Sequence, residues 1–132
     1  MATSLKGLGA LTLFVDDLPS ATAFYRDVFG LDIVFEDESS AAFGFGNTIL
    51  NLVLATEGPD LIGPAVVAPV SAGTRAQLTI WVDDTDAVCA LLTGRGAELL
   101  NGPIDRPWGK RTACIADPDG NVWEVAQDIA PA

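Results

Sequence analysis

The residue types that are missing from this chain narrow its possible chemistry first. Its 132 residues include no histidine, the side chain that most often serves as general base and transition-metal ligand. Nucleophilic systems of the Ser-His or Cys-His type are therefore excluded, together with any metal site that needs imidazole. Cys89 and Cys114 are too few for a disulfide framework and fall in apolar helix and strand patterns, so we predict that both are buried.

Glu124 is the most informative charged residue, because it interrupts an otherwise apolar strand pattern near the end of the chain. Its carboxylate could hold the amine of a ligand or act as the base of a metal-free reaction. It could also be a surface carboxylate or one satisfied by Gln77 or Arg111. Arg111, in the preceding strand pattern, could reach a ligand carboxylate or pair with Glu124. The residues alone leave these alternatives open.

Aromatic and short polar side chains alternate with aliphatic ones in two strand patterns. One pattern places Thr12 and Phe14 on the same face. The other places Gln77, Thr79 and Trp81 together. Such a mixture suits a ligand pocket, and Trp81 could stack on a planar ligand or hold a cation over its ring. Core packing is the alternative interpretation for Phe14.

The two patterns are copies of one unit, because residues 11–17 (LTLFVDD) return as residues 78–84 (LTIWVDD). Each copy reads as a strand that leads into a helix capped by Asp17 or Asp84. An internal repeat of this length indicates one supersecondary unit used twice. The expected elements of the first copy are strand 10–15, a helix that ends at Gly30, and strands 31–35, 42–45 and 48–54. Those of the second are strand 77–82, a helix closed by Gly94 and Gly96, strand 97–100, loop 102–109, and strands 110–116 and 122–127.

Length and composition predict a single domain, residues 1–132, with modules of about 8–55 and 76–128 joined by a linker, 56–75. The linker is rich in Gly and Pro but also apolar, which favours either packing on the core or a subunit interface, or a flap over a pocket. The formal net charge is −11, with 18 acidic and 7 basic residues, so nucleic acid is not an expected partner. No membrane span or secretory signal is visible, and a soluble cytoplasmic protein is expected.

Two motifs carry a resemblance to a known family. Residues 24–31 read FYRDVFGL at a helix end, and residues 117–121 read DPDGN in a turn that leads into the strand residues WEV at 123–125. Together with the repeat, they resemble the vicinal-oxygen-chelate superfamily, which includes glyoxalase I, bleomycin-resistance proteins, fosfomycin-resistance enzymes and extradiol dioxygenases. The resemblance implies an α+β fold in which two βαβββ modules form a cupped mixed sheet. It also implies a homodimer.

The resemblance further implies where a metal would be held. Ligands of metal-dependent members fall on the first and last strands of each module, which here places them at Ala10, Asn51, Gln77 and Glu124. One methyl group, two amides and one carboxylate are a poor set of ligands for a divalent cation. We therefore predict no metal site and no cofactor.

These observations favour a metal-free small-molecule-binding protein, similar to bleomycin-resistance proteins, that sequesters an aromatic and cationic compound such as an antibiotic. The alternative is a glyoxalase-like or dioxygenase-like lyase, isomerase or oxygenase with an atypical metal site or with Glu124 as its base. Trp108 joins the candidates because it lies in a loop rich in Gly and Pro that could form a rim or lid, although simple hydrophobic anchoring is the alternative. The predicted ligand-binding residues are Thr12, Phe14, Asn51, Gln77, Thr79, Trp81, Trp108, Arg111 and Glu124.

Overall fold

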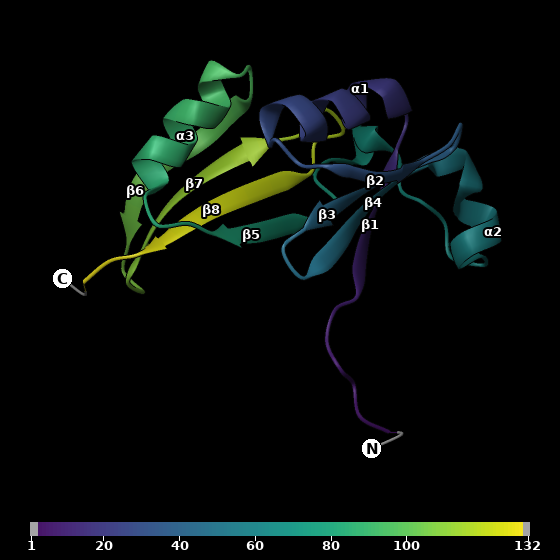
Figure 1. The fold of residues 1–132 in the computed structure, drawn as a ribbon, viewed down its shortest axis with the longest axis horizontal. Helices are drawn as coiled ribbons and strands as arrows, with labels where there is room; N and C mark the ends of the chain where they lie inside the picture. The colour runs from purple at the N-terminus through teal and green to yellow at the C-terminus, as the bar shows by residue number, and fades with distance from the viewer. Residues whose placement is uncertain (1–2, 131–132) are drawn as a thin grey trace. The chain divides into compact units, whose positions relative to one another are not determined.

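The computed structural model describes residues 3–130 and divides into two compact units. Unit 1 holds the chain up to Arg26 together with Gly30–Val67. Unit 2 holds Asp27–Phe29 together with the chain from Ala68 onward. Each unit contains one four-stranded mixed sheet and repeats the order β-α-β-β-β (Figure 1). The predicted α+β class and the pair of modules are confirmed.

The sheet of unit 1 has the strand order β1-β4-β3-β2, with β1 parallel to β4 and the other pairs antiparallel. Asp17 caps the first helix as predicted, because its carboxylate accepts a hydrogen bond from the backbone N–H of Ser20 at 3.1 Å. The helix continues as a π-helical turn and the chain then turns at Gly30. The elements of the first module are β1 (Ala10–Val15), α1 (Leu18–Ala23), η1 (Phe24–Val28), β2 (Ile33–Glu36), β3 (Ser40–Phe45) and β4 (Thr48–Leu54).

Strand alternation sorts the side chains of unit 1 as the sequence predicted. Leu13 and Val15 of β1 are buried, and α1 contacts β4 and β3 of the same sheet. Thr12 and Phe14 point to the opposite face. The buried side of the sheet is completed by Tyr25, Phe43, Leu50 and Leu52. One face of this sheet is therefore core, and we call the face opposite α1 the open face of unit 1.

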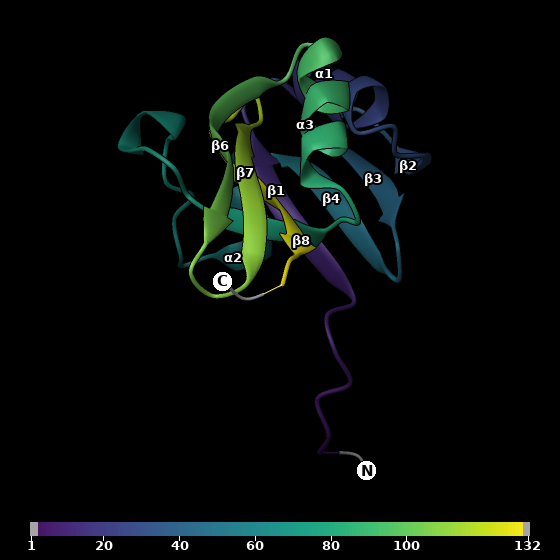
Figure 2. The ribbon, with the colours of Figure 1, turned by 90° about the vertical axis from the view of Figure 1, so that its left-hand side faces the viewer.

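Unit 2 repeats this arrangement with the strand order β5-β8-β7-β6. Helix α3 contacts β6, β7 and β8 and covers one face of the sheet (Figure 2). Cys89 and Cys114 are buried, as predicted. Trp123 is buried as well, and its ring meets that of Phe29 at 5.3 Å between centroids. We call the face opposite α3 the open face of unit 2. The elements are β5 (Gln77–Trp81), α3 (Thr85–Gly94), β6 (Glu98–Arg106), β7 (Lys110–Ala116) and β8 (Val122–Asp128).

The predicted loop at 102–109 is wrong, because β6 continues to Arg106. The register of β6 with β7 shifts between Asn101 and Ile104, where Gly102 and Pro103 form a bulge. Gly102 has φ +83°, and an added Cβ would lie 2.4 Å from the carbonyl oxygen of Thr112, so only glycine fits this close approach. The proline is tolerated because β6 is an edge strand.

The linker is more ordered than a loop of its composition suggests. It contains η2 (Ala55–Glu57), α2 (Gly58–Ile62) and η3 (Val70–Ala72). Apolar side chains remain exposed on it, with Leu61 at 60% and Val66 at 88%. Within residues 3–130, no helix is both long and apolar enough to cross a membrane.

Candidate functional site

A hollow of about 600 Å³ lies over the open face of unit 1. Two predicted ligand-binding residues, Thr12 and Asn51, stand side by side at its floor in the parallel pairing of β1 with β4. The side-chain amide of Asn51 donates to Thr12 Oγ1 over 3.4 Å, a long contact that a ligand could replace. The lining consists of Thr12, Phe35, Ser39, Ser40, Ala42, Asn51, Val53, Glu57, Asp60 and Leu61.

Part of this lining was missed from the sequence. The sequence placed Phe35 in a strand but did not assign it to a face of the sheet. Its pairing with Ala42 places both residues on the open face. Asp60 and Leu61 belong to α2, so the first half of the linker forms a wall of the hollow. Whether the linker acts as a flap over a pocket or packs on the core or across a subunit interface stays a prediction. Phe14 shares the strand face of Thr12 but does not line the hollow.

The open face of unit 2 brings four other predicted residues together. Thr79 and Glu124 are paired in the parallel ladder of β5 with β8, and Thr79 Oγ1 donates to Glu124 Oε1 over 2.9 Å. The amide of Gln77 reaches Cys114 Sγ at 3.9 Å. Trp81 follows on the same strand and is 71% exposed, so the prediction that it is not a core residue is confirmed. Glu124 is thus held by Thr79 and not by Gln77.

Two basic side chains and a second indole complete this face. Lys110 Nζ lies 4.7 Å from the centroid of the Trp81 ring and also forms an ion pair with Asp128. Arg106 is paired with Lys110 in the β6–β7 ladder, and its Cζ lies 5.8 Å from the centroid of the Trp108 ring. Trp108 is 64% exposed. Lys110 could have been found by strand alternation, whereas Arg106 was hidden inside the predicted loop.

Arg111 does not lie on the open face of unit 2. It alternates with Lys110 along β7 and therefore points to the face covered by α3. Its guanidinium binds Asp86 Oδ2 at 2.7 Å and Oδ1 at 3.0 Å, and Asp105 Oδ1 at 2.8 Å. The prediction that Arg111 could pair with Glu124 is wrong, because β alternation separates them. The hydrogen bonds from Arg111 hold the pKa of Asp86 below its usual range, and those carboxylates in turn raise the pKa of Arg111.

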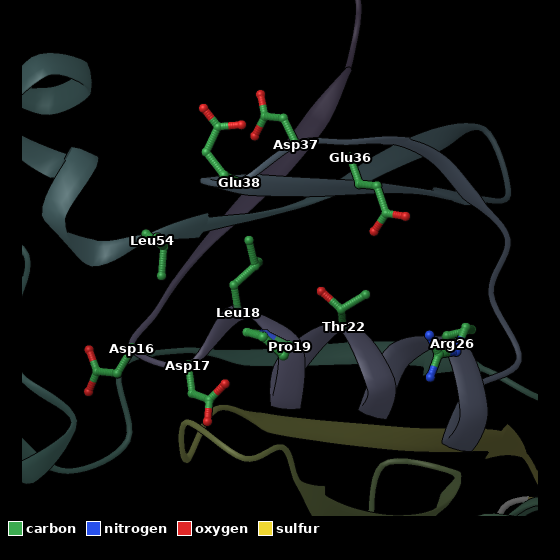
Figure 3. Close-up of a pocket in the computed structure, with 10 residues that line it drawn as sticks. All are labelled: Asp16, Asp17, Leu18, Pro19, Thr22, Arg26, Glu36, Asp37, Glu38 and Leu54. Carbon is green, nitrogen blue, oxygen red and sulfur yellow. The ribbon is translucent and has the colours of Figure 1, made fainter.

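A second hollow of unit 1, about 780 Å³, contains none of the predicted residues. It lies between α1 and the turn from β2 to β3, and Figure 3 shows carboxylates along its rim. Its lining consists of Asp16, Asp17, Leu18, Pro19, Thr22, Arg26, Glu36, Asp37, Glu38 and Leu54. Asp37 accepts hydrogen bonds from the backbone N–H groups of Ser39 and Ser40, which lower its pKa. Asp37 therefore stabilises this turn.

With this geometry in place, comparison with known proteins decides the family. Residues 7–125 match the family model of the Glyoxalase/Bleomycin resistance protein/Dioxygenase superfamily. The chain belongs to this superfamily. It is 30% identical over 119 residues to the uncharacterized protein YraH of Bacillus subtilis (strain 168), covering 87% of this chain and 93% of YraH.

Solved structures of the superfamily agree. A glyoxalase/bleomycin resistance protein/dioxygenase from Nocardioides superposes with a TM-score of 0.87 and 23% identity, covering 98% of this chain and 88% of that one. TnmS3, an antibiotic binding protein from Streptomyces sp. CB03234, superposes with a TM-score of 0.74 and 27% identity, covering 96% of this chain and 98% of its own. The first similarity establishes the fold, and the second relates the chain to a protein that binds an antibiotic.

The superfamily implies a metal in many members, and the residues at the corresponding positions do not fit one. The side chain of Ala10 has no donor atom, and Asn51 and Gln77 offer only neutral amide oxygens. Only Glu124 brings a charge, while hard divalent cations favour several oxygen ligands with carboxylates among them. Within the described part of the chain, no group of three or more His, Cys, Asp or Glu side chains is arranged to hold a metal ion.

Proposed function

We propose that this superfamily member is a metal-free small-molecule-binding protein that sequesters an aromatic compound, such as an antibiotic. The observation that carries the proposal is Trp81, an indole left 71% exposed beside the hydrogen-bonded pair Thr79–Glu124. A large uncovered ring next to a few fixed polar groups is the composition of a ligand site. The similarity to TnmS3 over nearly the whole chain supports the same conclusion.

The hollow of unit 1 supports this proposal independently. Its volume of about 600 Å³ lies within the range of about 300–1,000 Å³ typical of ligand pockets. Phe35, Val53 and Leu61 supply apolar walls, and Thr12 and Asn51 supply hydroxyl and amide groups. A molecule of one to three rings is matched to such a site in size and polarity.

The prediction of a cationic ligand finds less support from the contacts. The Trp81 ring already has the Lys110 ammonium 4.7 Å from its centroid, so a ligand cation would have to displace it. Glu124 could still attract a ligand amine, and Asp128 has the same parity on β8 but is paired with Lys110. The cytoplasmic location expected from the sequence stays a prediction.

A thermal-shift screen of aromatic compounds tests the proposal, with metal analysis of the purified protein alongside. A compound present at 100 times its dissociation constant should stabilise the fold by about 2.7 kcal/mol and raise the melting temperature by roughly 10 °C. Elemental analysis should find no stoichiometric divalent metal. One tightly held metal ion per chain, or turnover of an aromatic substrate that is lost in Glu124→Gln, would instead support the enzyme alternative.

We also propose that the protein is a homodimer. The family resemblance motivates this, and the linker leaves Leu61, Ile62 and Val66 exposed, which is costly on a monomer surface when such residues are contiguous. Light scattering at micromolar concentration should give twice the chain mass of 13.7 kDa. The variant Val66→Asp should shift the protein toward the monomer, and a wild-type monomer would contradict the proposal.

A further inference from the structure

Arg106 is a basic residue on the open face of unit 2 whose charge is not matched by a carboxylate. The chain has 18 acidic and 7 basic residues, yet no acidic side chain within residues 3–130 forms an ion pair with Arg106. Arg111, on the other face of the same sheet, binds two carboxylates. Arg95 also has no carboxylate partner among the described residues, but it donates to the backbone carbonyl of Val28, whereas Arg106 lies on the open face beside exposed aromatic rings and could attract an anion.

The geometry of Arg106 suits a planar anion. Arg106 Nε donates to Thr112 Oγ1 over 3.0 Å, and Thr112 is only 1% exposed, so a buried hydroxyl fixes one edge of the guanidinium. The two terminal nitrogens form no hydrogen bond within the described residues. Two parallel N–H groups held in one plane match the two oxygens of a carboxylate.

The neighbours of Arg106 add a second cation and two rings. Lys110 is its partner in the β6–β7 ladder, and Trp81 lies beside the Lys110 ammonium. The ring of Trp108 lies 5.8 Å from the guanidinium carbon. Both indoles are largely exposed, at 71% and 64%. A flat aromatic ring could stack on either indole while its acidic group reaches the Arg106 guanidinium. Lys110 is paired with Asp128 and adds a second positive charge nearby.

We propose that the open face of unit 2 binds aromatic carboxylates, with Arg106 as the residue that holds the carboxylate and Lys110 as its helper. This inference rests on the proposed function and names the ligand class of the same site. The net charge of −11 does not forbid it, because exposed charges farther away than about 8 Å are largely screened at physiological salt. The contacts near Arg106 then decide the preference.

Three probes of the same shape and different charge test the proposal: 2-naphthoate, the neutral 2-naphthamide and the cationic 2-naphthylmethylammonium. Isothermal titration calorimetry with the full-length protein should show that 2-naphthoate binds about tenfold or more tightly than 2-naphthamide. Arg106→Gln should abolish this preference, because it should lower the affinity for 2-naphthoate far more than the affinity for 2-naphthamide. Arg106→Lys should keep only part of it, because an ammonium does not form the paired contact.

Arg111→Gln is the matched control, because it changes the net charge equally and acts on the opposite face of the sheet. It should leave the preference intact. Melting temperatures of all variants establish that they are folded. Tighter binding of the amide or the cation, or an equal loss in Arg111→Gln, would overturn the inference and leave the proposed function standing. Failure of all three probes to bind at millimolar concentration would overturn both.

Discussion

The change Trp81→Ala separates the binding role of this residue from any role in folding. Trp81 is 71% exposed, so about 29% of its surface is covered in the protein. An enclosed indole buries up to about 250 Å², so the covered part is roughly 70 Å² and contributes about 2 kcal/mol. Loss of the contact with Lys110 adds about 0.5–1 kcal/mol. The variant should therefore lose about 2–3 kcal/mol of unfolding free energy and remain folded.

The same change should remove a larger share of the binding free energy than of the unfolding free energy. A ligand that covers half of the exposed part of the ring removes roughly 90 Å² from water, which is worth about 2 kcal/mol. Offset stacking adds about 0.5–1.5 kcal/mol. Together these effects predict a loss of about two to two and a half orders of magnitude in affinity for the neutral probe 2-naphthamide. Titration calorimetry measures this loss, and urea unfolding measures the stability.

Trp123 provides the internal contrast, because it is 4% exposed and lies on the opposite face of the sheet. Trp123→Ala should cost about 3–5 kcal/mol, the usual range for a buried aromatic residue. The reasoning fails if Trp81→Ala is destabilised as strongly as Trp123→Ala. It fails as well if folded Trp81→Ala binds 2-naphthamide with unchanged affinity.

Three further changes test other parts of the structure. Glu124→Gln keeps an acceptor for Thr79 and removes a negative charge, so calorimetry should show weaker binding of 2-naphthylmethylammonium and no loss for 2-naphthoate. Asp117→Ala should destabilise the fold by about 3 kcal/mol in urea unfolding, because the buried carboxylate accepts three hydrogen bonds in the turn before β8. Asp86 has a lowered pKa in the folded state, so its bond to Arg111 stabilises the protein above about pH 4 and is lost as the pH falls below the folded-state pKa. In Asp86→Asn, the unfolding free energy should fall less steeply as the pH is lowered through the acidic range. An unchanged fall would contradict this assignment.

The repeat explains why the fold could be predicted in detail. Two copies of a strand with an acidic end set the start of each module, and the alternation within them assigned Leu13 and Trp81 to opposite kinds of face. Both helix caps were found because an aspartate before a helix accepts a backbone hydrogen bond at a characteristic spacing. Features of this kind are set by residues close together in the sequence, so they can be predicted without knowledge of the tertiary contacts.

The errors arose where tertiary contacts decide. Gly102 and Pro103 indicated a loop, but the close approach to β7 uses them as a bulge inside an edge strand. Arg106 was therefore assigned to a loop and its place on the open face was missed. Arg111 was predicted beside Glu124, but the register of β7 with β8 pairs Arg111 with Gln127 and places it on the opposite face. The contribution of α2 to a hollow could not be read from a stretch rich in Gly and Pro.

A ligand amine is expected to bind near Glu124 and a ligand carboxylate near Arg106, and these two residues lie at different ends of the same face. Arg106 pairs with Lys110 near one end of β7, whereas Glu124 pairs with Cys114, four residues farther along this strand. At about 3.3 Å per residue along β7 and about 4.8 Å from one strand to the next, Arg106 and Glu124 are roughly 16 Å apart, because they lie on the strands to either side of β7. A ligand that is acidic at one end and a hydrogen-bond donor at the other would use both. Side chains that far apart with no shared partner should act additively, so the double variant Arg106→Gln/Glu124→Gln should show the sum of the two single effects on affinity.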